Sequence, residues 1–160
     1  LKNILEEGEL ATVALRTGEI TDAKDIDASW LEIYTRDLQS ASFVNGAQAQ
    51  FGSEPDITIV GSDGLTKAGI EIKAGIDPAA ALERFGAMLK SFEKVKLDSP
   101  AAETILIATC ITDEVESRLE TLNEVSRTFV LTEVVHDRKG KGKALMSILR
   151  GLAGLTSLPL

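Results

Sequence analysis

The chain has 160 residues, a length that fits one domain with a single sizeable core. Hydrophobic residues make up 44% of it and charged residues 26%, a globular composition that excludes a disordered or fibrous protein. The single cysteine, Cys110, excludes an internal disulfide. No apolar run reaches the roughly 20 residues that span a bilayer, and the N-terminus lacks the layout of a signal peptide. We therefore expect a cytoplasmic protein without membrane contact.

The charge is unevenly distributed along the chain. The net charge of −8 argues against attraction of the whole molecule to nucleic acid. The last forty residues are the exception, with a net charge of +3 that centres on Lys139, Lys141 and Lys143. Glycines separate these lysines, so the loop either folds against a phosphate backbone or is simply solvated. We take the three lysines, called the basic segment below, as candidate nucleic-acid contacts.

The first half of the chain predicts two helices and three extended segments. Apolar residues of segment 1–16 recur at roughly helical spacing, and a polar, acidic connector follows up to residue 28. Ser29 and Glu32 have the spacing of a capping box and predict the start of the second helix. The extended segments come next, at 42–51, 55–60 and 68–74.

The second half predicts alternating helices and strands. Asp77 before Pro78 indicates the start of a long helix that runs to about Lys96. The elements after it are a buried strand, a helix, a strand and, beyond the basic segment, a short helix, at 104–110, 113–123, 128–135 and 143–150. Such an order predicts an α/β fold in which helices flank a mixed central sheet.

A predicted hairpin around Asp63 and Gly64 carries the residues of chemical interest. This dipeptide is typical of two-residue turns, and a turn centred on it pairs residues whose numbers sum to 127, so that Asp56 faces Glu71. Because side chains alternate along a strand, Asp56, Glu71 and Lys73 share one face, while the isoleucines share the other and enter the core. Opposed carboxylates repel each other, and a divalent cation would compensate them.

These three side chains predict a metal-dependent site. Magnesium commonly binds one or two carboxylates together with water and phosphate, so Asp56 and Glu71 are candidate ligands. The ammonium of Lys73 would orient an attacking water or neutralise charge that develops on a phosphate. The competing interpretation is an edge hairpin that carries a solvated glutamate and lysine.

The same residues resemble a known motif. Pro55-Asp56, fourteen intervening residues and Glu71-Ile72-Lys73 resemble the PD-(D/E)xK nuclease motif, and residues 70–75 are similar to type II restriction endonucleases of the XcyI kind. The resemblance covers about residues 29–110. It implies hydrolysis of double-stranded DNA with Mg²⁺, or Mn²⁺ as a substitute, and assigns the metal to Asp56, Glu71 and the Ile72 carbonyl, with Lys73 assisting the water. Such sites often add an acid from the first helix, and Glu32 is the positional match.

The resemblance implies one nuclease-like domain with a restriction-endonuclease-like core. We expect an N-terminal helix and connector at 1–28, the catalytic core at 29–110 and a C-terminal extension at 111–160. The acidic charge and short length are unusual for an enzyme that reads DNA sequence, which leaves room for a homodimer or a recognition region outside these residues. The alternative function is a catalytically inactive module that binds a protein or nucleic-acid partner.

Overall fold

A computed structural model of the chain describes residues 1–75, 81–109, 111, 113–119 and 121–155. The strands are β1 (Leu10–Leu15), β2 (Ile20–Asp22), β3 (Leu38–Phe43), β4 (Gln48–Phe51), β5 (Ile57–Val60), β6 (Thr66–Lys73), β7 (Glu103–Ala108) and β8 (Arg127–Val130). The α-helices are α1 (Lys2–Glu6), α2 (Ala28–Tyr34), α3 (Ala81–Asp98), α4 (Asp113–Leu119), α5 (Leu131–Val135) and α6 (Lys141–Leu152). Short 3-10 turns are η1 (Ala23–Asp25), η2 (Thr35–Asp37) and η3 (Arg138–Gly140).

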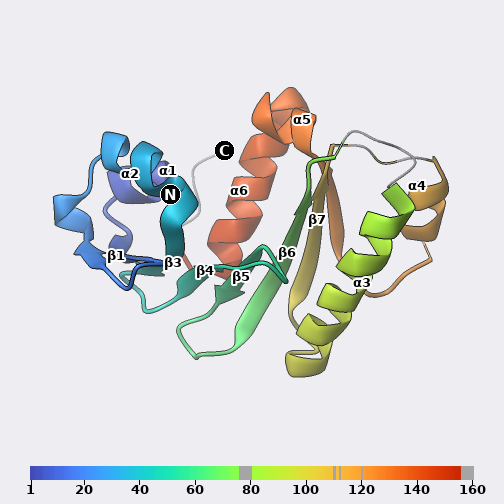
Figure 1. Ribbon diagram of the computed structural model, residues 1–160, viewed down its shortest axis with the longest axis horizontal. Helices are drawn as coiled ribbons and strands as arrows, with labels where there is room; N and C mark the ends of the chain where they lie inside the picture. Colours follow the sequence, from blue (N-terminus) through green and yellow to red (C-terminus); the bar gives the residue numbers. More distant parts are fainter. Residues whose placement is uncertain (76–80, 110, 112, 120, 156–160) are drawn as a thin grey trace.

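The eight strands of the described residues form one mixed sheet, in the order β2-β1-β3-β4-β5-β6-β7-β8. Neighbours from β2 to β6 are antiparallel, whereas β6, β7 and β8 are parallel. The helices cover both faces of the sheet (Figure 1). The predicted α/β class, a mixed sheet flanked by helices, is therefore confirmed.

Two apolar clusters hold the helices on the sheet. The larger cluster joins Leu145 of α6 to Ile59, Ile70 and other side chains on one face of the sheet. On the opposite face, Met88 and Phe92 of α3 pack against β7 in the smaller cluster. Strands β6 and β7 are thus covered from both sides. None of the helices in the described residues is long and apolar enough to cross a membrane.

The N-terminal prediction of a helix over 1–16 is wrong beyond residue 6. Gly8 has a φ of +71°, a left-handed conformation that suits glycine and ends α1. Residues 10–15 instead form β1, whose side chains at Leu10, Val13 and Leu15 are buried. The strand is set by pairing with β2 and with the distant β3, which local helical spacing does not reveal.

The predicted capping box is also wrong, because α2 begins one residue before Ser29. The carboxylate of Asp27 accepts the backbone N–H of Trp30 at 2.8 Å and caps the helix. The hydroxyl of Ser29, which donates to the same carboxylate, and then the Trp30 N–H lower the pKa of Asp27. Glu32 is consequently not needed as a capping residue and is exposed.

Two other predicted strands are divided in the structure. Segment 42–51 is a hairpin of β3 and β4 rather than one strand, and 128–135 divides into β8 and α5. The predicted helix start at Asp77 and Pro78, and Cys110, lie outside the described residues.

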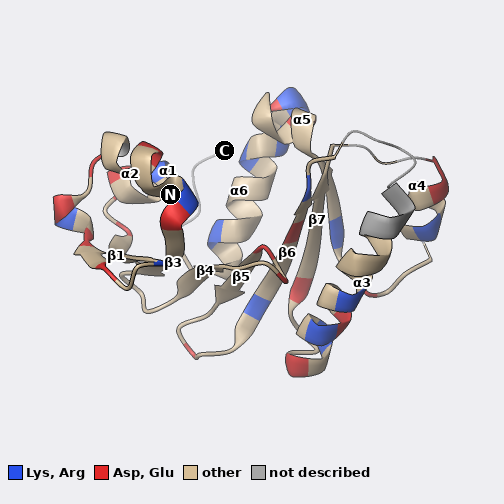
Figure 2. Ribbon diagram, in the orientation of Figure 1, with Lys and Arg blue, Asp and Glu red and all other residues tan. Residues whose placement is uncertain are grey.

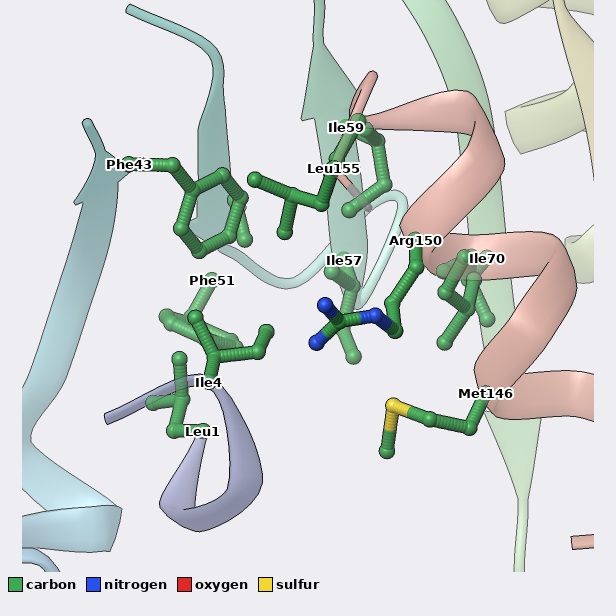
Figure 3. A pocket seen from close by; sticks show the side chains of 13 residues that line it. Leu1, Ile4, Phe43, Phe51, Ile57, Ile59, Ile70, Met146, Arg150 and Leu155 are labelled. Carbon is green, nitrogen blue, oxygen red and sulfur yellow. The ribbon is translucent and has the colours of Figure 1, made fainter. Parts of the chain in front are cut away.

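A buried charge connects the two ends of the described chain. Arg150 of α6 is only 1% exposed and forms ion pairs with Glu7 at 2.7 Å and with Glu9, both between α1 and the body of β1. Figure 3 shows its guanidinium among the apolar side chains that line a cavity of about 140 Å³ between α1, the sheet and α6. The N-terminal segment and the last helix thus share one electrostatic contact inside the core.

Candidate active site

The hairpin of β5 and β6 positions the predicted site residues. Ile57 pairs with Ile70, and Thr58 pairs with Gly69, which confirms the predicted register along this part of the strands. The connection is longer than a two-residue turn: it spans residues 61–65, and Gly64, with a φ of +78°, has the left-handed conformation while Asp63 does not. A register shift next to Val60 absorbs the difference, so the pairing near Asp56 is unchanged.

Asp56 stands immediately before β5, beside the end of β6. Its Oδ2 accepts the backbone N–H of Ile72 at 2.6 Å, and its own carbonyl accepts the N–H of Gly52 at 2.9 Å. The side chain is half-buried. The carboxylate is therefore held against the backbone that links Glu71 to Lys73.

Glu71 and Lys73 point to the face of β6 that α3 covers. Glu71 is only 1% exposed, and its Oε2 accepts a hydrogen bond from Nζ of Lys73. The Lys73 side chain is 26% exposed, so its ammonium reaches the surface while its partner is buried. The interpretation of a solvated glutamate and lysine on an edge hairpin is wrong, because β6 is a central strand and Glu71 lies in the interior.

The carbonyl of Ile72 points to the same side as Asp56. In a strand, the N–H and C=O of one residue point in the same direction, and the N–H of Ile72 points to Asp56. The next carbonyl, that of Lys73, points the other way and accepts the N–H of Thr109 at 3.1 Å, as this alternation requires. The Asp56 carboxylate and the Ile72 carbonyl thus lie on the same side of the β6 backbone.

Thr109 is a contributor to the site that the sequence analysis did not identify. It follows β7, and its hydroxyl donates to the carbonyl of Gly75 at 2.9 Å. With the bond from its N–H to Lys73, this residue fixes the backbone on both sides of Ala74. The sequence shows only that a threonine follows a buried apolar strand. This pattern does not indicate which residue accepts the hydrogen bond of its hydroxyl.

Glu32 does not join this group. It is exposed on α2, and α2 lies over the β1 and β3 end of the sheet, far from β6 in Figure 1. Strands β4 and β5 separate β3 from β6 in the sheet order. The structure therefore gives no support to a catalytic role for Glu32.

The basic segment lies at the same edge of the sheet as the site. Parallel strands end at a common edge, and β8 leads directly through α5 into η3 and the first turn of α6. Lys139, Lys141 and Lys143 are all exposed there, and Figure 2 shows basic residues at this corner. The corner is ordered by Asp137, whose Oδ1 accepts the N–H of Lys143 at 3.0 Å. It is on the α6 face of the sheet, opposite to the face that holds the Glu71 side chain.

A polar groove of about 400 Å³ lies next to Asp56. It follows the part of β3, β4 and β5 that no described helix covers on the α3 face (Figure 1). Most of its lining side chains are uncharged hydrogen-bonding groups, namely Gln39, Ser40, Gln48, Gln50 and Thr58. Glu54 and Pro55 close it on the side of the site.

The donor atoms of the site fit the expected Mg²⁺ ion. Asp56, Glu71 and the Ile72 carbonyl offer only oxygen ligands, which Mg²⁺ prefers. Oε1 of Glu71 is buried and has no hydrogen-bond partner among the described residues, an arrangement that a cation or water would compensate. The described residues contain no group of three or more His, Cys, Asp or Glu side chains placed for a metal, but Mg²⁺ commonly uses one or two carboxylates.

Comparison with known proteins identifies one family. The profile of XcyI restriction endonucleases matches residues 35–156. The matched range contains Asp56, Glu71, Ile72, Lys73 and the basic segment, and it excludes Glu32. No protein of curated function and no solved structure matches the chain.

Proposed function

This chain belongs to the XcyI restriction endonuclease family, and from that membership we propose that it is a Mg²⁺-dependent endonuclease for double-stranded DNA. The family itself implies DNA cleavage. The observation that supports the proposed site is the contact between the Asp56 carboxylate and the N–H of Ile72, beside the buried pair of Glu71 and Lys73. We also propose a cytoplasmic location, where the enzyme would meet its DNA substrate.

Each residue has a distinct task in the proposed reaction. Asp56, Glu71 and the Ile72 carbonyl would hold Mg²⁺, which supplies Lewis-acid polarisation of the scissile phosphate. Lys73 orients a water for attack on phosphorus and neutralises the charge that develops as the bond to the departing sugar oxygen breaks. Its partial exposure suits this task, because the ammonium contacts both Glu71 and the solvent side.

We propose that DNA binds at the end of the sheet that holds Asp56 and Lys73, between the basic segment and the polar groove. The basic segment would bind phosphates, and the polar groove beside Asp56 would receive a strand near the site. Glutamine amides pair with the edge of adenine in DNA, and their neutral charge avoids repulsion of phosphate. A homodimer or a further recognition region would supply the remaining contacts.

Cleavage of supercoiled plasmid in Mg²⁺, Mn²⁺ and EDTA tests the function. We expect wild type to cut with either metal and Lys73→Ala to be slowed by about a hundredfold or more, because a preorganised charge at the transition state is lost. Lys67→Ala is the matched control: Lys67 lies on the same strand but is paired with Asp63 at 2.6 Å, beyond the site. Lys67→Ala should unfold like wild type, whereas Lys73→Ala leaves the buried Glu71 carboxylate without its cation and should unfold at lower urea, so cleavage is compared under conditions where both variants are folded.

Two outcomes contradict the proposal. Wild-type cleavage by Lys73→Ala would remove the role of that lysine. A wild type that binds DNA but cuts it with neither metal would instead support the inactive nuclease-like module.

A further inference from the structure

Helix α3 makes an unusually close contact with β6 at Gly69. A Cβ atom at Gly69 would lie 2.7 Å from Cγ2 of Val95, which is too close for two carbon atoms. Val95 itself is buried. The absence of a side chain at residue 69 thus lets α3 rest directly on this strand.

From this contact, β6 and α3 both extend toward the end of the sheet that holds Glu71 and Lys73. Along β6, two residues lead from Gly69 to Glu71, about 7 Å on the same face. Along α3, which connects parallel strands and runs antiparallel to them, one turn leads back from Val95 to Ser91, about 6 Å. Ser91 is buried, so it faces the sheet. The two side chains are therefore placed opposite each other.

Each of these two side chains has a buried polar atom without a partner. In the described part of the chain, Oε1 of Glu71 and Oγ of Ser91 make no hydrogen bond, although the residues are only 1% and 5% exposed. Unsatisfied buried polar groups are rare and unfavourable. Because the two atoms make no direct bond, one buried water between the hydroxyl donor and the carboxylate acceptor would satisfy both.

We propose that Ser91 is a positioning residue for Glu71, whose Oε1 it holds from its hydroxyl through one buried water. Lys73 already binds the other oxygen, so the two contacts fix the rotation of the carboxylate. A carboxylate oxygen has two lone pairs, which leaves Oε1 able to bind a cation as well. This role rests on the proposed nuclease function, but the contact itself does not.

A double-mutant cycle in EDTA tests the contact without activity. Ser91→Ala is compared in wild type and in the Glu71→Met background, where an unbranched apolar chain replaces the acceptor. We expect Ser91→Ala to lower the urea midpoint in wild type and to leave it unchanged or raise it in the Glu71→Met background. If the alanine variant does not fold, Ser91→Cys is nearly isosteric and a much weaker donor.

Calorimetric titration with Mn²⁺ tests the positioning role. Loss of a group that orients a metal ligand typically weakens metal affinity by 10- to 100-fold, so we expect about a tenfold loss in Ser91→Ala. The control is Ser117→Ala, because the exposed Ser117 hydroxyl donates within α4 to the Asp113 carbonyl. That variant should bind Mn²⁺ like wild type.

The outcomes separate this inference from the proposed function. An equal midpoint shift in both backgrounds, with unchanged Mn²⁺ affinity, overturns the role of Ser91 even if the enzyme cuts DNA. Coupling between the two residues in a wild type that cuts no DNA supports the contact and refutes the nuclease proposal alone.

Discussion

Substitution of Asp56 by alanine and by asparagine separates its structural and metal-binding tasks. In Asp56→Ala, the N–H of Ile72 loses the oxygen that accepts it at 2.6 Å, and a half-buried donor without a partner costs about 1–3 kcal/mol. Asparagine keeps an oxygen at this position but loses the charge, and hydrogen bonds to charged and neutral acceptors differ by about 1 kcal/mol. We therefore expect Asp56→Asn to be destabilised by at most about 1 kcal/mol in EDTA.

Added metal should widen the difference in stability between wild type and both variants. A site that forms only in the folded protein gains about 2.7 kcal/mol at a hundredfold excess of metal over Kd. Both variants should lose most of that gain because each lacks the Asp56 carboxylate. Urea unfolding followed by the fluorescence of Trp30, the single tryptophan, measures all three proteins in EDTA and in Mn²⁺. Equal losses for the two variants in EDTA, or a wild-type gain from Mn²⁺ in either one, would refute the reasoning.

Three other expectations concern DNA, packing and pH. Replacing all three lysines of the basic segment by alanine should flatten the log–log salt dependence of DNA binding by about 2 to 3 units, since each phosphate contact contributes about 0.9; an unchanged slope on filter binding would show a solvated loop. Gly69→Ala should destabilise the protein by about 1–3 kcal/mol in urea, because its Cβ meets Val95, and wild-type stability would disprove the close contact. The Arg127 guanidinium, hydrogen-bonded to Glu103 at 2.5 Å, lowers the pKa of that carboxyl, so the pair stabilises above the ordinary glutamate pKa of about 4.3 and less as pH falls through the lowered value. Glu103→Gln should thus cost about 0.2–1 kcal/mol at pH 7 and nothing near pH 2, and a pH-independent difference would contradict the ion pair.

The hairpin could be predicted because its signals are local. Alternating isoleucines define the two strands, and the turn residues define the register that brings Asp56 beside the end of β6. No local signal indicates that the Asp56 carboxylate accepts the N–H of Ile72, so that it does more than repel Glu71. Strand β5 begins at Ile57, two residues after the predicted start, so Asp56 lies just outside the strand.

Features that depend on distant partners could not be predicted. The strand β1 exists through its pairing with β3, more than twenty residues away, and its apolar spacing alone also suits a helix. Glu71 is buried because α3 covers its face of β6. The contacts of Thr109 depend on β6 being the neighbour of β7, and the proposed role of Ser91 depends on α3 packing over β6. Each of these contacts is long-range, whereas periodicity and turn residues report only on neighbours in the sequence.

The ion pairs of Arg150 have a consequence for the order in which the chain matures during synthesis. Glu9 is synthesised 141 residues before Arg150 of α6, the cation with which it and Glu7 pair. These ion pairs therefore form only after α6 has been synthesised. Glu7 and Glu9 lie outside residues 35–156, the range that the family profile matches. A fragment limited to that range would keep the buried Arg150 guanidinium and lose both carboxylates. Removal of one partner of a buried ion pair typically costs about 3–5 kcal/mol, so such a fragment should be less stable than a chain that retains Glu7 and Glu9.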